Sequence, residues 1–234
     1  MGILSEKALS ALPSTEFDRW WNSPGEWVEE ANQRRGGESG VRLLQSWDNS
    51  RPALYCKRQT GHTHRSWRHP LGRPTILREL EAYRALARLG VRTPNIVYCA
   101  ARRETGQWQA LLVTEALQGF ISLEQWYAQP MPAAETQAML RQLALTLARM
   151  HLGRWQHGCC YAKHIFIRLR APGDVDIALL DLEKSRTRWR SASASRRDLG
   201  QLQRHRGQMP ESDMQVLLQA YQHALNNPRG VLQP

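Results

Sequence analysis

Apolar residues recur at the three-and-four spacing of a helix face in two long segments of the chain. In residues 75–89 the periodic stretch is followed by Gly90, at a position where glycine commonly ends a helix. Residues 132–149 repeat the pattern and begin at a proline, which is favoured in a first helical turn. The spacing therefore predicts a helix in each segment, and a further one over about 212–225.

Shorter segments show the alternation and clustering of apolar residues that is typical of strands. The pattern predicts strands over residues 52–58, 91–103, 108–117, 165–169 and 176–182. A turn at 170–174 separates the last two, so we expect them to pair as a hairpin.

Two basic segments interrupt these patterns. Residues 58–74 are rich in Arg, His, Gly and Pro and are predicted to be a loop. Its histidines, His62, His64 and His69, could bind a metal, but a mobile basic loop is the simpler interpretation. Residues 186–197 combine arginine with serine, which is typical either of a disordered stretch or of a segment that meets a substrate.

The order of these elements indicates two lobes. Strands, one helix and further strands precede a linker near residues 118–120, and a mostly helical half with one small hairpin follows. We therefore predict an α+β fold with an N-lobe of residues 1–117, built as an antiparallel sheet with one helix. The predicted C-lobe, residues 118–234, is mainly helical, and we expect a cleft between the lobes.

The charge of the chain favours an anionic partner. Its 234 residues include 32 Lys and Arg against 21 Asp and Glu, a net charge of +11 at pH 7. Such a balance suits nucleic acid, anionic lipid or a phosphorylated substrate. No run approaches the roughly 18 apolar residues that a membrane helix needs, and the N-terminus lacks the pattern of a signal peptide. The four cysteines have no paired spacing, which indicates free thiols in a reducing compartment.

Several candidate residues gain meaning from their order along the chain. Lys57 lies on a predicted strand, Glu79 borders the apolar face of a predicted helix, and Asp181 ends a predicted strand. Each alone has an ordinary structural explanation. Together, a strand lysine, a helix glutamate and an aspartate after a hairpin are the parts of a protein-kinase-like phosphotransferase. There the lysine neutralises nucleotide phosphates, the glutamate fixes the lysine and the aspartate holds Mg²⁺.

A glycine-rich stretch is a further candidate for nucleotide binding. Gly36, Gly37 and Gly40 lie between two strand-like pieces, but they do not form a G-x-G-x-x-G pattern. A turn that covers nucleotide phosphates and a plain loop both fit this stretch.

The chain resembles the lipopolysaccharide kinase family, the Kdo kinase, WaaP and InaA-like group of kinase-fold enzymes, from about residue 35 to 222. The motifs that carry the resemblance are YCKR with Lys57, RELEAYRALARLGVRTP with Glu79, VTEAL, HGCCYAKHIFIR, LLDLEKSR with Asp181, and RRDLGQL with Asp198.

The resemblance implies roles for individual residues. His157 would open the catalytic loop, and His164 would be a metal ligand where most kinases have asparagine. Asp181 would bind the metal, and Lys163 would stabilise the transferred phosphoryl group. The VTEAL segment, with Glu115 and Leu117, would be the hinge beside the nucleotide.

One departure from the family concerns the position two residues after the loop histidine. Cys159 stands where most kinases have a catalytic aspartate, and a thiol is a poor substitute for a carboxylate that accepts a proton. Three outcomes stay open: a weak kinase, a non-catalytic pseudokinase, or a kinase with a displaced base. The candidates for that base are Asp174, Asp176 and Glu183.

The activity that the resemblance implies is phosphorylation of a sugar, heptose or Kdo, of the lipopolysaccharide core, with ATP and Mg²⁺ as cofactors. It would take place in the cytoplasm, at the anionic inner face of the inner membrane. The competing classes are a pseudokinase with a binding or stress-response role and a basic nucleic-acid-binding protein. No helix-turn-helix, zinc-finger, KH or RNP signature occurs, so we expect no specific nucleic-acid partner.

Overall fold

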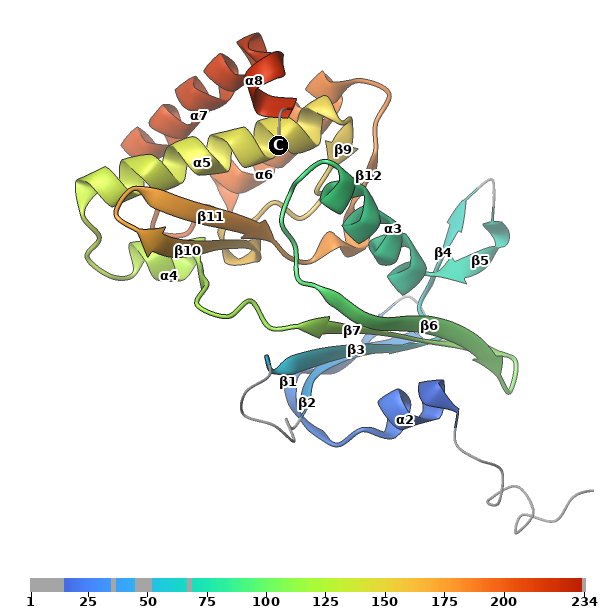
Figure 1. Ribbon diagram of the computed structural model, residues 1–234. Helices are drawn as coiled ribbons and strands as arrows, with labels where there is room; N and C mark the ends of the chain where they lie inside the picture. Colours follow the sequence, from blue (N-terminus) through green and yellow to red (C-terminus); the bar gives the residue numbers. More distant parts are fainter. Residues whose placement is uncertain (1–14, 35–36, 45–51, 67–68, 233–234) are drawn as a thin grey trace, which may run out of the picture. The chain divides into compact units, whose positions relative to one another are not determined.

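The computed structural model describes residues 15–34, 37–44, 52–66 and 69–232 (Figure 1). By their internal contacts they form two units. The first unit comprises the described part of Met1–Pro74 together with Ile96–Thr114, and the second comprises Thr75–Asn95 and the described part of Glu115–Pro234. The predicted lobe boundary at residue 117 stays a prediction, and the contacts group the 75–95 segment with the second unit.

The first unit is built on a five-stranded sheet with the strand order β1-β2-β3-β7-β6. Its pairs β1–β2, β2–β3 and β6–β7 are antiparallel. The strands are β1 (Gly25–Arg34), β2 (Gly37–Leu44), β3 (Leu54–Thr60), β6 (Ile96–Glu104) and β7 (Gln107–Glu115). A short helix, α2 (Glu16–Asn22), and a hairpin of β4 (Thr63–Ser66) and β5 (His69–Pro74) complete the unit.

Helix α2 closes one side of the core of this sheet. Its Phe17 packs with Leu44, Cys56 and Leu111, all of them buried. Because side chains alternate along a strand, a buried Cys56 places the neighbouring Lys57 on the opposite face of β3.

The second unit contains the longer helices. They are α3 (Thr75–Arg88), α4 (Leu123–Tyr127), α5 (Ala133–Leu152), α6 (Ser191–Arg204), α7 (Glu211–Asn226) and α8 (Pro228–Leu232). A three-stranded sheet has the order β11-β10-β8, with β8 (Ile121–Ser122), β10 (Ile165–Ala171) and β11 (Asp174–Leu179). A small ribbon pairs β9 (Trp155–Gln156) with β12 (Arg186–Thr187), and two 3₁₀ turns, η1 (Ala162–His164) and η2 (Leu182–Lys184), flank the strands.

Helix α5 is the centre of the second core. Its apolar face packs against α7 and β11, which brings elements far apart in the sequence together (Figure 1). Leu143, Leu147 and Met150 are fully buried on that face, and each such side chain stabilises the fold by about 1.5–3 kcal/mol.

The periodic segments have the predicted structure. Helices α3, α5 and α7 confirm the three predicted helices, and β10 and β11 confirm the predicted hairpin. Strands β3, β6 and β7 confirm the strands predicted on either side of α3. No helix among the described residues is long and apolar enough to cross a bilayer.

The loop predicted over residues 58–74 was wrong, and one of the two interpretations of residues 186–197 is excluded. Residues 58–74 are not a loop, because the strands β4 and β5 pair there and His62 is buried. Residues 186–197 are not a disordered stretch, because β12 and the first turns of α6 form there, and their role as a segment that meets a substrate stays a prediction. In α6 only Ala194 and Leu202 bury apolar side chains, so the sequence has too few apolar residues there to mark a buried helix face.

Candidate active site

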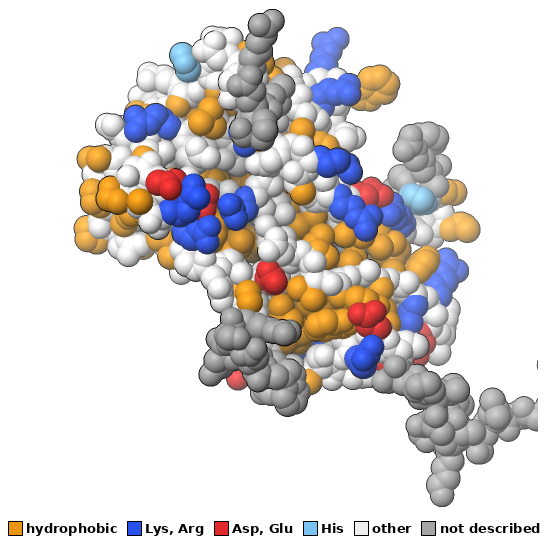
Figure 2. All heavy atoms as spheres, viewed as in Figure 1, with side chains coloured by type: hydrophobic (Ala, Val, Ile, Leu, Met, Phe, Trp, Pro, Cys, Tyr) orange, Lys and Arg blue, Asp and Glu red, His pale blue; other side chains and the backbone are white. Residues whose placement is uncertain are grey.

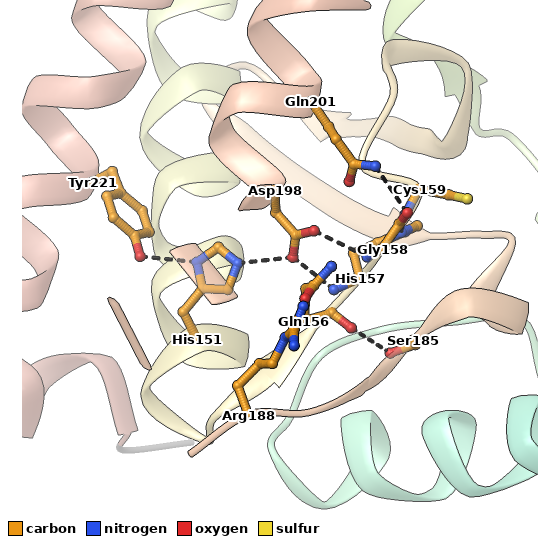
Figure 3. A network of polar contacts seen from close by, with 10 residues as sticks. All are labelled: His151, Gln156, His157, Gly158, Cys159, Ser185, Arg188, Asp198, Gln201 and Tyr221. Atoms are coloured by element: carbon orange, nitrogen blue, oxygen red, sulfur yellow. Dashed lines mark hydrogen bonds and ion pairs between the residues drawn. The ribbon is translucent and has the colours of Figure 1, made fainter. Parts of the chain in front are cut away.

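The start of the 157–164 loop is held by one buried carboxylate. Asp198 of α6 accepts hydrogen bonds from the backbone amides of His157 (2.6 Å) and Gly158 (2.9 Å) (Figure 3). One turn further along the helix, Gln201 Nε2 donates to the carbonyl oxygen of Gly158 (2.9 Å). Helix α6 therefore fixes the backbone conformation at the point where the loop begins.

Two further buried side chains hold Asp198 itself. His151, at the end of α5, has its Nε2 3.1 Å from Asp198 Oδ2, and its Nδ1 2.8 Å from the hydroxyl of Tyr221 on α7 (Figure 3). A carboxylate can only accept, so Nε2 carries the hydrogen. In the neutral ring, Nδ1 is then the acceptor for the hydroxyl of Tyr221. Three helices thus converge on the loop through one hydrogen-bonded chain.

The loop also packs closely against the segment that follows Asp181. Gly158 has φ +84°, and a Cβ there would lie 2.5 Å from the carbonyl oxygen of Lys184. Beside it, the hydroxyl of Ser185 donates to the carbonyl oxygen of Gln156 (2.8 Å). Glycine is required at residue 158 both for the left-handed conformation and for this contact.

The structure brings the two predicted metal ligands together. Asp181 Oδ2 lies 3.6 Å from His164 Nδ1, and the Leu180 amide donates to the carbonyl oxygen of His164 (2.9 Å). His164 Nδ1 is also 2.9 Å from the carbonyl oxygen of Cys159. A carbonyl can only accept, so Nδ1 donates, and Nε2 keeps a lone pair with which it can bind a metal.

Asp181 has an unusual backbone conformation. Its φ of 60° and ψ of 62° lie in the left-handed region, which costs a residue with a side chain about 1–2 kcal/mol. Strained residues of this kind cluster at functional sites. The turn directs the chain from β11 into η2, and Arg78 of α3 donates through Nε to the carbonyl oxygen of Glu183 there (2.8 Å).

His157 is fully buried and neutral. Its Nδ1 accepts a hydrogen bond from the amide of Cys159 (3.2 Å), so the hydrogen is on Nε2, which has no hydrogen-bond partner among the described residues. Burial lowers the pKa of His157 to about 4, although the charges of Asp198 and Asp181 oppose the shift. His157 is therefore suited to hold the loop rather than to transfer protons near neutral pH.

The thiol of Cys159 is also uncharged near neutral pH. Burial, with a contribution from the charge of Asp181, raises the pKa of Cys159 to about 11, while Lys184 opposes the shift. In Figure 3 the sulfur points away from the Asp198 network. A thiol with such a pKa cannot act as a general base, and Lys184 places a cation next to it.

Two of the three candidates for a displaced base are engaged by arginines. Asp176 accepts from Arg168 (2.6 Å) and lies 3.6 Å from Arg170, and Asp174 is 2.9 Å from Arg170. Acidic and basic side chains are interleaved over the β10–β11 hairpin in Figure 2. The third candidate, Glu183, lies in η2, two residues after Asp181. A displaced base stays a prediction at all three.

The predicted nucleotide-binding residues fall in both units. Lys57 lies on β3 of the first unit, and Glu79 is buried on α3 of the second, so their ion pair stays a prediction. Glu115 ends β7, where its carboxylate accepts from Asn95 Nδ2 (2.8 Å), and Leu117 follows two residues later. Lys163 is exposed on η1.

Only part of the glycine stretch is described. Gly37 and Gly40 lie in β2, where they pair with Arg34 and Arg58, and Gly36 lies outside the described residues. A Cβ on Gly37 would meet the His62 amide at 2.4 Å, so this glycine is required for close packing of the chain. A role of the stretch in covering phosphates stays a prediction.

Within the described ranges, no group of three or more His, Cys, Asp or Glu side chains could hold a metal ion. Asp181 and His164 lie close together without a third such side chain among the described residues, and their role as metal ligands stays a prediction. The Asp181 carboxylate fits Mg²⁺, whereas an imidazole is not one of the oxygen ligands that Mg²⁺ prefers.

Several residues that support the loop or lie near Cys159 belong to no motif that predicts such a role for them. They are His151, Gln156, Lys184, Ser185, Gln201 and Tyr221. The only local signal was proximity, since Lys184 and Ser185 directly follow the DLE sequence that begins at Asp181.

Comparison with known proteins identifies relatives over nearly the whole chain. The profile of the lipopolysaccharide kinase (Kdo/WaaP) family matches residues 18–221. Protein InaA of Escherichia coli (strain K12) is 43% identical over 214 residues, which cover 90% of this chain and 96% of InaA. A solved structure of WaaP in complex with acyl carrier protein matches with a TM-score of 0.65 at 19% identity, covering 98% of this chain and 94% of that chain. These matches confirm the resemblance and the α+β, kinase-like fold.

Proposed function

Because this chain belongs to the lipopolysaccharide kinase (Kdo/WaaP) family, we propose that it is an ATP-dependent phosphotransferase acting on a heptose or Kdo sugar of the lipopolysaccharide core. The single observation that carries the proposal is the pairing of Asp181 with His164 beside a loop held by Asp198. A kinase needs a metal ligand and a rigid catalytic loop at one place, because phosphoryl transfer depends mainly on positioning and charge stabilisation.

In this proposal each residue has a defined task. Asp181 Oδ2 and His164 Nε2 hold the metal of a bound metal–ATP complex, and Lys57 neutralises the nucleotide phosphates. Mg²⁺ bound there would neutralise charge on the phosphate oxygens. Lys163 and Lys184 supply positive charge near the loop.

The neutral thiol of Cys159 predicts a slow enzyme rather than an inactive one. A loose transition state places little demand on a base, so positioning and cations can still supply much of the rate. Where a general base contributes fully, its loss lowers the reaction rate on the order of 10²–10⁴-fold. We expect a smaller loss of rate in this protein.

A pseudokinase is the second candidate function. The observation that favours it is the raised pKa of Cys159, which leaves no charged group at the base position. Such a protein would bind nucleotide weakly or not at all, and would act through a binding or stress-response role.

The partners and location follow from the family and from charge. We place the protein in the cytoplasm at the inner face of the inner membrane, because a net charge of +11 attracts an anionic surface. Acyl carrier protein, the partner of WaaP in the solved complex, is a second candidate partner. A nucleic-acid-binding role is the remaining alternative, and a thermal shift with oligonucleotide but not with Mg²⁺-ATP would support it.

The deciding experiment measures ATP consumption and the gain of one phosphoryl group on a panel of defined core acceptors. We expect phosphorylation of at least one acceptor, loss of it in Asp181→Ala, and retention in Glu211→Ala, which removes an exposed carboxylate of α7 that has no assigned role. Mg²⁺-ATP binding without transfer to any acceptor would favour the pseudokinase. Equal activity of Asp181→Ala and wild type would contradict the assigned site.

A further inference from the structure

Basic side chains gather on one face of the β9–β12 ribbon. Arg186 pairs directly opposite Gln156, and residues two apart on a strand share a face, so Arg188 follows on the same side. Arg188 confirms this by donating through Nε to Gln156 Oε1 (2.5 Å) (Figure 3). Helix α6, which carries Arg197, packs against β9, and the charge of Arg197 acts on Arg186.

These arginines are not neutralised by neighbouring acids. Among the described residues no carboxylate forms an ion pair with Arg186, Arg188 or Arg197, and the first turn of α6 carries no acidic residue. Burial and the charges of Arg188 and Arg197 lower the pKa of Arg186, which shows that like charges crowd it. The nearest acid, Asp198, is fully buried and occupied by His151 and by two backbone amides.

The face also offers hydrogen-bond donors without acceptors. Gln156 is fully buried, its Oε1 is taken by Arg188, and its Nε2 has no partner among the described residues. The guanidinium groups therefore present only N–H groups, and the buried amide nitrogen of Gln156 beside Arg188 has no acceptor among the described residues. Arrangements of this kind bind oxyanions, because the planar guanidinium fork matches the oxygens of a phosphate or carboxylate.

We infer that Arg186, Arg188 and Arg197 form a binding site for a phosphate monoester. A monoester carries a charge of about −1.5 to −2 at pH 7, whereas a carboxylate or a phosphodiester carries only one negative charge. Three neighbouring cations are best compensated by the more highly charged group, and its three terminal oxygens can accept hydrogen bonds from the arginines.

The site borders the candidate active site through Gln156 but does not depend on the proposed function. Strand β9 of the ribbon directly precedes His157, and strand β12 directly follows Lys184 and Ser185. Its ligand would be either a soluble or sugar-borne phosphate, or a lipid whose headgroup is a phosphate monoester. The fully exposed Trp189, next to Arg188, is positioned to enter a membrane interface in the second case.

Calorimetric titration of the full chain with methyl phosphate and dimethyl phosphate, at matched ionic strength, tests the inference. We expect the monoester to bind about tenfold or more tightly than the diester. Arg186→Gln and Arg197→Gln should each weaken methyl phosphate binding by about tenfold. Arg204→Gln, the same charge change at an exposed position of α6, should leave it unchanged.

Lowering the pH gives an independent readout. The second pKa of the ligand is about 6, so binding should weaken as the pH falls from 7.5 to 5 while the arginines stay charged. Equal affinity for the two probes, or variants at Arg186 and Arg197 that behave like Arg204→Gln, would overturn the inference.

Two further experiments distinguish this site from the nucleotide site and identify the source of the phosphate. Lys57→Ala should weaken Mg²⁺-ATP binding but not methyl phosphate binding, and Arg186→Gln should do the reverse. Vesicles with phosphatidic acid, compared with phosphatidylglycerol vesicles of equal charge, test the lipid source. The site binds a lipid if the protein prefers phosphatidic acid and if this preference is lost in Arg186→Gln and weakened in Trp189→Ala. The site binds a soluble or sugar-borne phosphate if methyl phosphate binds but the vesicles show no such preference.

Discussion

Oδ2 of Asp181 lies 3.6 Å from Nδ1 of His164, although the two residues come from different turns on either side of the β10–β11 hairpin. Because Nδ1 donates to the carbonyl oxygen of Cys159, Nε2 is the nitrogen that would bind the metal in the proposed site. That site would combine one hard oxygen ligand with one nitrogen ligand.

This ligand pair predicts an altered metal preference. A site with a nitrogen ligand binds Co²⁺ more strongly than does a site built only of oxygen ligands, the kind that Mg²⁺ prefers. We expect His164→Asn to lower the affinity for Co²⁺-ATP relative to Mg²⁺-ATP, and Asp181→Asn to weaken both about tenfold or more. Nucleotide titrations with each metal measure the ratio, and an unchanged ratio in His164→Asn would remove the imidazole from the metal site.

Gly158 should be far less tolerant of a side chain than a glycine of similar conformation elsewhere. Gly158→Ala and Gly173→Ala introduce a Cβ at φ +84° and +75°, but only the first would meet backbone, at 2.5 Å from the carbonyl oxygen of Lys184. We expect Gly158→Ala to destabilise the protein by about 1–3 kcal/mol more than Gly173→Ala. Urea denaturation measures the difference, and equal losses would mean that the loop and the Lys184 segment are not in contact.

The buried chain around Asp198 predicts a graded loss of stability. Asp198→Ala leaves the amides of His157 and Gly158 without an acceptor and should cost about 3 kcal/mol. Tyr221→Phe leaves both amides paired with Asp198 and removes only neutral hydrogen bonds of the hydroxyl, to His151 and Ser195, so it should cost about 1 kcal/mol. Thermal denaturation of both variants checks the order, and a larger loss in Tyr221→Phe would contradict the central role of Asp198.

The sequence predicted those helices and strands in which apolar residues recur at a regular spacing within the segment itself. The helix that carries Glu79 and the hairpin that precedes Asp181 show the spacing of their kind within a few residues. The β4–β5 hairpin was missed because its strands are rich in Arg, His and Pro and show no apolar alternation. The start of α6 was missed because serine and arginine there bury almost nothing.

The arrangement of the site could be predicted only in part, because contacts between distant residues leave no local pattern in the sequence. Asp181 and His164 were found through motifs, but the support of the loop depends on contacts between distant residues. His151 meets Asp198 across 47 positions and Tyr221 across 70. No local spacing relates such residues, since the packing of α5, α6 and α7 brings them together.

Burial of neutral His157 predicts that the protein loses stability in mild acid. Its pKa is about 4 in the folded protein against 6.5 when exposed, so the unfolded chain takes up a proton that the folded protein refuses. Stability should therefore fall by up to about 3 kcal/mol as the pH drops from 6.5 to 4. His157→Gln should remove most of this dependence in urea titrations, whereas His223→Gln, at an exposed position, should retain it.

Replacement of Cys159 by aspartate tests whether the missing carboxylate limits the reaction. The thiol has a pKa of about 11 because it is buried near Asp181, so Cys159→Asp places a second negative charge beside the first. We expect this variant to be less stable than wild type without metal, because like charges repel, and to regain stability with Mg²⁺-ATP. It should also raise phosphotransfer or background ATP hydrolysis, by about 10²-fold, the low end of general-base effects.

Cys159→Ser is the matched control, since it keeps a small neutral group and adds no charge. Its activity should stay close to that of wild type, because a thiol with a pKa of about 11 contributes no base near neutral pH. Loss of a measurable wild-type activity in Cys159→Ser would mean that the sulfur itself takes part in the chemistry. If Cys159→Asp is as inactive as wild type on every acceptor, and Asp181→Ala changes nothing, the site is not catalytic and the pseudokinase is the better description.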